Sequence, residues 1–220
     1  MWGLTKANRF VKIYMPETNN PAWRPIMIVD IDTIVDAIYY LRSKFTGPEK
    51  VSKLKIVKLI YLADKYHLLC YGRTITNDRY CAVINGPMGS TVANVLTADT
   101  EYLTPGDKKK ISELIDRNDK YNIRLKNLTH KTNMLSESDE EAIDFIFKKF
   151  GKRSVHELID YVHLLPEWAP YGELLKSGGV KYIDIEPQGL LGVVRGDIFS
   201  KTIPKEHIKV SRKILLGEIV

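Results

Sequence analysis

The residues best suited to chemistry recur at intervals of three along one predicted helix. They are a lysine, a tyrosine, an aspartate and a histidine: Lys58, Tyr61, Asp64 and His67. This spacing places them along one side of a helix, beside an apolar stripe that includes Val57. A polar strip at the border of a core suggests a site. Taken alone, His67 near the end of its helix is more often a packed or capping histidine than a ligand or a base.

Cysteine and histidine side chains offer an alternative chemistry. His67 and Cys70 are three residues apart with Cys81 beyond, but the Cys-x-x-Cys and His-x-x-x-His pairs typical of zinc sites are absent. A cysteine nucleophile needs a histidine to activate it, and only folding can bring His163 or His67 close enough. We therefore keep a cysteine hydrolase as a third class of function, behind two binding classes.

Phosphate binding and acid–base catalysis have weaker support. The segment N-G-P-M-G-S at 85–90 lacks the lysine and the spacing of a P-loop. The chain has no Gly-x-Ser-x-Gly elbow and no carboxylate pair whose spacing demands acid–base work. The sequence therefore indicates no enzyme, no cofactor and no metal site, and a binding protein is the leading expectation.

Composition predicts one folded domain. The chain has 220 residues, of which 44% are hydrophobic and 27% charged, the balance of a folded protein. No stretch approaches 18 consecutive apolar residues, and the first residues lack the pattern of a secretory signal. We therefore expect a cytoplasmic protein without membrane contact, and two cysteines fit a reducing compartment.

The formal charge of +6 favours association with nucleic acid or with an acidic protein. The basic residues are mixed with acids, as in the run from Lys108 to Lys110 before Glu113. Ordinary solvated helix faces are the simpler interpretation of such a pattern. A basic nucleic-acid-binding regulator of its own operon is therefore the alternative function.

Periodicity and breakers predict an α+β fold with a mainly helical core of about five to six helices and a small antiparallel sheet. The central helix runs from about residue 50 to 71, with Ser52 as its cap and Gly72 as its terminator. Other helices are expected from Asp30 or Asp32 to Phe45, from Ser90, and at 107–118, 136–150 and 155–164. Strands are expected at 80–84, 121–128 and 180–185, and also within 198–220, where an arm docking on a partner is the other interpretation.

These elements fall into three parts. Residues 1–29 carry three prolines and predict an irregular N-terminal extension. Residues 30–175 form the helical domain, and residues 176–220 form a strand-rich tail packed on the same domain. No internal repeat and no long linker divides them further.

Three segments, in order, resemble the Panacea domain of SocA-like antitoxins. They are KLKIVKLIYLADKYH followed by YGRTI, the NGP turn before a helix, and SESDEEAIDFIFKKFGKRSVHELIDYVHLLPEW. The resemblance spans about Leu54 to Tyr171. The chain departs from it at Asn85, where the family often has tyrosine, and at Met88, where valine is common.

This resemblance implies an antitoxin of a bacterial or prophage toxin–antitoxin pair. Such a protein neutralises a separate protein toxin, encoded by a neighbouring gene, by direct binding. In the SocA type it also delivers the toxin to a Clp-type protease. Trp168 fits either an interface anchor or a cover for the end of its own helix. The residues predicted to bind the partner are Lys58, Tyr61, Asp64, His67, Gly86, Pro87, His163, Glu167 and Trp168.

Overall fold

The computed structural model describes residues 29–47, 50–97 and 103–218. Within these residues the chain forms nine α-helices, two short 3-10 helices and six short strands, so the predicted α+β class is confirmed. The helices outnumber the five to six expected because the C-terminal part adds three of them. The extension predicted for residues 1–29 lies, apart from its last residue, outside the described residues.

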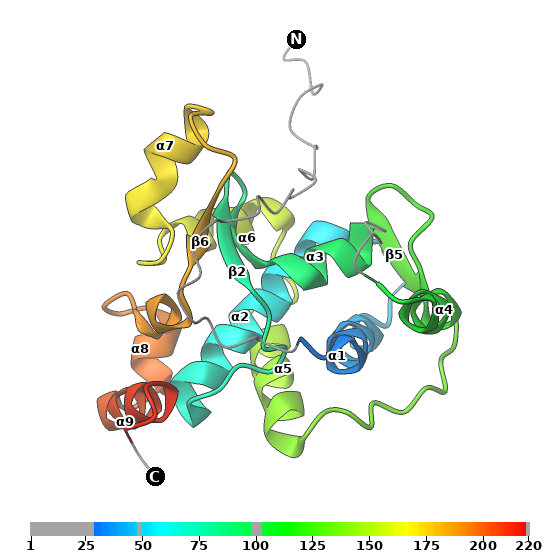
Figure 1. The fold of residues 1–220 in the computed structure, drawn as a ribbon, viewed down its shortest axis with the longest axis horizontal. Helices are drawn as coiled ribbons and strands as arrows, with labels where there is room; N and C mark the ends of the chain where they lie inside the picture. The colour runs from blue at the N-terminus through cyan, green and yellow to red at the C-terminus, as the bar shows by residue number, and fades with distance from the viewer. Residues whose placement is uncertain (1–28, 48–49, 98–102, 219–220) are drawn as a thin grey trace.

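Helix α2 (Lys53–Tyr71) is the centre of the fold (Figure 1). Ser52 caps its start by accepting a hydrogen bond from the Lys55 amide, and Gly72 ends it with a φ of +76°, as the sequence predicts. Side chains on every side of α2 are buried. The helix is enclosed because α1, α3, α5, α6 and α9 all pack against it.

The helices around α2 begin at clear sequence signals. Helix α1 (Ile31–Ser43) is capped by Asp30, whose side chain accepts from the Asp32 amide. Capping boxes, in which the cap residue and the third helical residue bond reciprocally, start α4 (Pro105–Leu114), α5 (Glu137–Phe150) and α6 (Val155–His163). Helix α3 (Ser90–Thr97) follows a strand directly. Helix α4 ends before the predicted residue 118, because the chain turns into a strand at Ile115.

Two small antiparallel sheets replace the single sheet expected. One has the order β1 (Val51–Ser52), β5 (Asn122–Leu125) and β4 (Ile115–Asp116). The other has the order β3 (Gly86–Gly89), β2 (Tyr80–Val83) and β6 (Tyr182–Ile185), with Cys81 opposite both Met88 and Asp184. In the second sheet, β3 packs against both α2 and α6.

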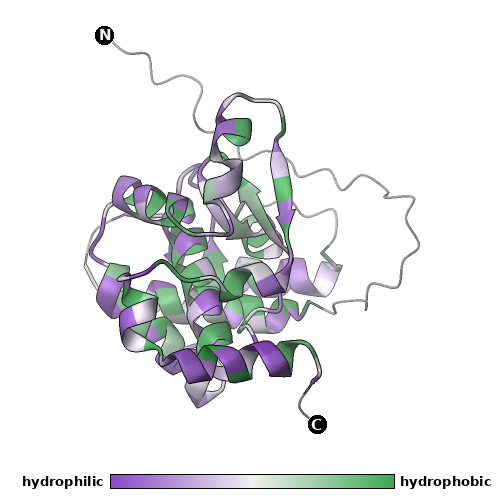
Figure 2. Cartoon of the chain, turned by 90° about the vertical axis from the view of Figure 1, so that its left-hand side faces the viewer, coloured by the Kyte–Doolittle hydropathy of each residue, from purple (hydrophilic) through white to green (hydrophobic). Residues whose placement is uncertain are grey.

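The strand prediction for 198–220 is wrong over the described residues of that segment. After η1 (Ala169–Tyr171), α7 (Gly172–Lys176) and η2 (Pro187–Leu191), the chain forms α8 (Ile198–Thr202) and α9 (Lys205–Leu215). Ile208, Ser211 and Leu215 point inward at helical spacing. The lysines and the apolar residues of this segment belong to different sides of one helix, and Figure 2 shows both kinds of residue around α9.

Among the described helices, none combines the length and the apolar character that crossing a membrane requires.

The end of α2 generates a stability prediction. A Cβ at Gly72 lies 2.8 Å from Ile214 Cβ, whereas a Cβ at Gly178 meets nothing within 4 Å, and both glycines have a φ close to +77°. Gly178→Ala should therefore cost about 1 kcal/mol of unfolding free energy, the backbone effect alone. Gly72→Ala should cost about 2 kcal/mol or more, because α9 must also shift. Urea denaturation measures both values, and equal losses would contradict the packing of α9 on the end of α2.

Candidate functional site

A buried ion pair forms the centre of the candidate site. The Nζ of Lys65, on α2, lies 2.9 Å from Oε1 and 3.1 Å from Oε2 of Glu167, which follows α6. The two side chains are 0% and 1% exposed. The Tyr61 hydroxyl donates a hydrogen bond to Glu167 Oε1. A buried charge pair is stable only when further hydrogen bonds offset its desolvation, and Tyr61 supplies one of them.

Lys65 also holds the C-terminal part of the chain. Its Nζ donates to the carbonyl oxygens of Leu190 at 2.7 Å and of Gly192 at 2.6 Å. One lysine thus joins α2 to Glu167 and to η2. The sequence prediction missed Lys65, although its position four residues after Tyr61 and seven after Lys58 places it on the same side of the helix.

Lys58 fixes the turn between β2 and β3. Its Nζ donates to the carbonyl oxygens of Gly86 at 2.8 Å and Pro87 at 2.7 Å, so the structure brings these three predicted residues together. Burial lowers the pKa of Lys58 to about 7. Gly86 has a φ of +96°, and a Cβ there would overlap Val162 of α6. Only glycine therefore fits this turn between α2 and α6.

The rings of His163 and Trp168 stack at the end of α6. Their centroids are 3.7 Å apart and their planes differ by 7°. The Trp168 indole donates to the Val83 carbonyl at 2.8 Å, which ties this segment to β2. A Cβ on Gly172 would lie 2.8 Å from the Trp168 ring, so α7 begins in direct contact with the stack. Burial lowers the pKa of His163.

Asp64 anchors the loop that follows α2. Its carboxylate accepts from the amides of Ile75 and Thr76, both at 2.9 Å, and from the Thr76 hydroxyl at 2.6 Å. Burial raises the pKa of Asp64 to about 7, against the opposing effect of the hydrogen bonds from Thr76. The role of Asp64 in the fold is to hold the loop in place.

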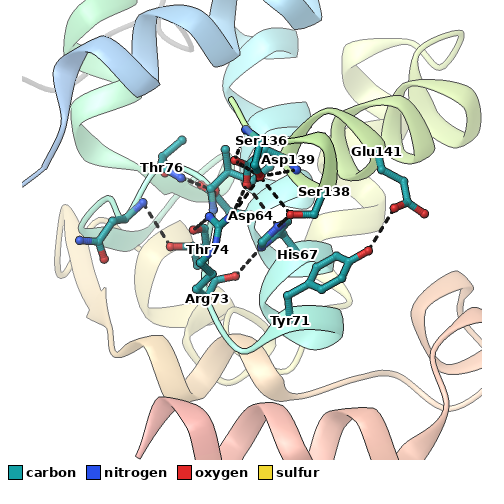
Figure 3. A network of polar contacts seen from close by, with 12 residues as sticks. Asp64, His67, Tyr71, Arg73, Thr74, Thr76, Ser136, Ser138, Asp139 and Glu141 are labelled. Atoms are coloured by element: carbon teal, nitrogen blue, oxygen red, sulfur yellow. Dashed lines mark hydrogen bonds and ion pairs between the residues drawn. The ribbon is translucent and has the colours of Figure 1, made fainter. Parts of the chain in front are cut away.

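His67 joins the end of α2 to the start of α5 (Figure 3). Its Nδ1 donates to the Arg73 carbonyl at 2.8 Å, because a carbonyl can only accept. Its Nε2 lies 3.0 Å from Ser138 Oγ and 3.2 Å from Asp139 Oδ1. Burial lowers the pKa of His67, so the neutral ring accepts from Ser138 at neutral pH. The charge of Asp139 is then neutralised by Arg73, whose Nη2 lies 2.9 Å from Asp139 Oδ1.

The nine predicted site residues form two internal clusters. Asp64 and His67 lie at the C-terminal end of α2, and the other seven lie around Lys58 and Glu167. Lys58, Asp64 and His67 are 0% exposed and Tyr61 is 1% exposed. These side chains hold elements of the fold together, and in this conformation they do not form an exposed face. Direct contact between them and a partner stays a prediction.

The cysteines gain no catalytic support from their surroundings. Burial raises the pKa of Cys81 to about 12, and burial also raises the pKa of Cys70. The thiolate is the nucleophilic form, and a raised pKa makes it scarce at neutral pH.

The sequence prediction missed a group of exposed apolar side chains beside the His163–Trp168 stack. Each lies within two residues of one that contacts the stack or belongs to it: Leu164 follows His163, Ile84 follows Val83, and Tyr171 and Leu174 lie on either side of Gly172. They are 38–65% exposed. We call this group the apolar patch: Ile84, Leu164, Tyr171 and Leu174. Its signal in the sequence is the segment 164–174, in which the exposed residues include only one charged side chain, that of Glu173.

Comparison with known proteins gives one finding. The family model described as "Antitoxin SocA-like, Panacea domain" matches residues 56–169, from the first buried turn of α2 to the residue after Trp168. Searches of curated proteins and of solved structures each returned no significant match.

The buried ion pair generates a double-mutant prediction. Glu167→Leu should cost about 3–5 kcal/mol of unfolding free energy, because it leaves the Lys65 charge buried without a counter-ion. The double variant Lys65→Met/Glu167→Leu should lose clearly less unfolding free energy than the sum of the losses in the single variants Lys65→Met and Glu167→Leu. The exposed pair Lys176–Glu173, at 3.6 Å, is the matched control and should couple by less than about 1 kcal/mol. Similar coupling energies for the two pairs would contradict the central role of Glu167.

Lys58 generates a pH prediction. Its pKa falls from 10.5 to about 7 on folding, so the unfolded chain binds more protons between these values and stability rises with pH. Between pH 7 and 9, the unfolding free energy of the wild type should rise faster than that of Lys58→Met, by up to about 1.4 kcal/mol per pH unit. Urea titrations at pH 7, 8 and 9 measure the two slopes. Parallel slopes would show that Lys58 keeps its ordinary pKa.

Proposed function

Since the chain belongs to the SocA-like antitoxin family with the Panacea domain, we propose that it neutralises a separate protein toxin by direct protein–protein binding. The matched residues make up just over half of the chain and include the Lys65–Glu167 pair and the His163–Trp168 stack. The toxin is expected from a neighbouring gene.

The observation that supports this proposal most is the apolar patch, whose residues adjoin a fixed base in the chain. Interface cores are poor in charge and rich in large apolar and aromatic side chains, and the patch has this composition. Leu164 is 65% exposed and Ile84 is 52% exposed, so both are available to a partner. The Trp168 indole is bonded to Val83, the residue before Ile84, and its ring is stacked on His163, the residue before Leu164. Such a base limits the entropy lost when a partner binds.

In this proposal most of the predicted site residues act indirectly. Glu167 is held by Tyr61 and Lys65, and the next residue is Trp168. Lys58 holds the β2–β3 turn two residues after Ile84. The buried network therefore positions the two chain segments that carry the patch, and the exposed side chains make the contact. A binder of this kind needs no catalytic group.

A substitution of Leu164 tests this proposal. The gene next to the one that encodes this protein is expressed in a bacterial host, with and without this protein. Growth is scored, and copurification of the two gene products is measured. Neutralisation with copurification is the expected result for the wild type. Leu164→Glu should weaken the complex at least tenfold, because it puts an unpaired charge in the interface.

Leu128→Glu is the matched control, since Leu128 is 79% exposed and lies outside the patch. It should bind like the wild type. Equal binding by both variants would show that the interface lies outside the patch. If the product of the neighbouring gene is not toxic and does not copurify, the antitoxin proposal itself is contradicted.

Repeating the growth assay in a host that lacks Clp proteases separates two modes of neutralisation. Direct binding alone predicts that protection persists in that host. Loss of protection with the complex intact would assign the protein the further role of a proteolytic adaptor.

A further inference from the structure

Helix α9 lies beyond the matched residues 56–169 and is fixed to the fold by its inner side. Ser211 is 1% exposed, and its hydroxyl donates to the Leu69 carbonyl at 3.0 Å. Ile214 packs against Gly72 at the end of α2. These contacts set which residues of α9 point to solvent.

The outer side of α9 carries a row of like charges. Lys205, Lys209 and Lys213 are spaced by four residues, Arg212 lies beside them, and all four are exposed. Like charges at this spacing destabilise a helix. In the described part of the chain, the only ion pair on α9 is Lys209 with Glu206, at 2.9 Å. Residues 201–218 contain five basic and two acidic residues. The row is therefore a cationic surface that an anionic partner would stabilise.

We propose that this lysine row of α9 binds the phosphate backbone of duplex nucleic acid. The three lysines span roughly 12 Å along the helix, and duplex DNA carries one negative charge per about 1.7 Å of its axis. A continuous polyanion therefore meets every lysine at once. Lysine binds phosphate as a point charge and needs no pocket, which fits an exposed row on a convex helix.

Two apolar residues of α9 are unavailable to a membrane surface. Membrane-surface helices bury an apolar face in the lipid and place their basic residues along its border. Here Ile208 and Leu215 are packed against the protein core. Val210, Ile214 and Leu216 are 42–47% exposed, and Ile214 also lies against Gly72. On the solvent side the four basic residues therefore outnumber the apolar ones, which favours a polyanion over lipid.

This binding surface is independent of the proposed toxin interface. Helix α9 packs at the C-terminal end of α2, by Leu69 and Gly72, whereas α7, which carries part of the patch, lies at the upper left of Figure 1, with α8 drawn between it and α9 at the lower left. Contacts from lysines to phosphates carry no base information. The expected binding is therefore weak, independent of sequence and strongly dependent on salt.

The test uses the full chain and a labelled 20-base-pair duplex, with affinity measured by fluorescence anisotropy between 50 and 200 mM NaCl. The variant is Lys205→Gln/Lys209→Gln/Lys213→Gln. The control is Lys108→Gln/Lys109→Gln/Lys148→Gln, which removes the same charge from exposed positions on α4 and the far end of α5. Circular dichroism checks that both variants fold.

Removal of three phosphate contacts should make the negative slope of log affinity against log salt shallower by about 2.7, while the control keeps the wild-type slope. Equal losses in both variants, or no duplex binding by the wild type at 50 mM NaCl, would overturn the proposal.

A parallel titration with phosphatidylserine vesicles covers the membrane alternative. Loss of vesicle binding by the α9 variant with duplex binding unchanged would also overturn the proposal. Toxin neutralisation should be unchanged in the α9 variant, which keeps the two proposals separable.

Discussion

The fold depends on one buried charge pair, Lys65 with Glu167. A lysine and a carboxylate removed from water are stable only when their other hydrogen-bonding groups are satisfied. Here Tyr61 and two backbone carbonyls of the C-terminal part meet that requirement. The pair therefore determines the positions of two chain segments relative to α2, the one that carries Glu167 and the one that carries Leu190 and Gly192. Packing alone is less selective, because apolar contacts tolerate many arrangements.

The same pair connects the buried network to the exposed surface. Glu167 precedes Trp168, whose ring stacks on His163 and whose indole bonds to β2. The exposed patch is carried by the residues around this stack. Membership in an antitoxin family gives the general role, and in our proposal the fixed base and the exposed apolar residues around it make the contact with the toxin.

Much of the architecture could be predicted from local sequence signals. Ser52, Gly72 and the Ser154–Glu157 pair act at helix ends through their immediate neighbours, so sequence alone reveals them. The C-terminal helices were missed because the inward positions of α9 include Ser211, which is polar and is buried only through its bond to Leu69. Seven of the nine predicted site residues lie around Lys58 and Glu167, while Asp64 and His67 form a second cluster. Their buried partners are on the β2–β3 turn, on the segment after α6 and at the start of α5, all distant in the sequence. Periodicity along one helix does not encode such tertiary contacts.

The central claim is that the apolar patch contacts the partner while the buried network holds it in place. Hydrogen exchange of the full chain, alone and with the copurified neighbouring gene product, tests this claim most directly. The expected result is new protection of backbone amides at 84–85 and 164–174 on complex formation, with 120–130 unchanged. Protection confined to 120–130 or to α9, with the patch unaffected, would contradict it.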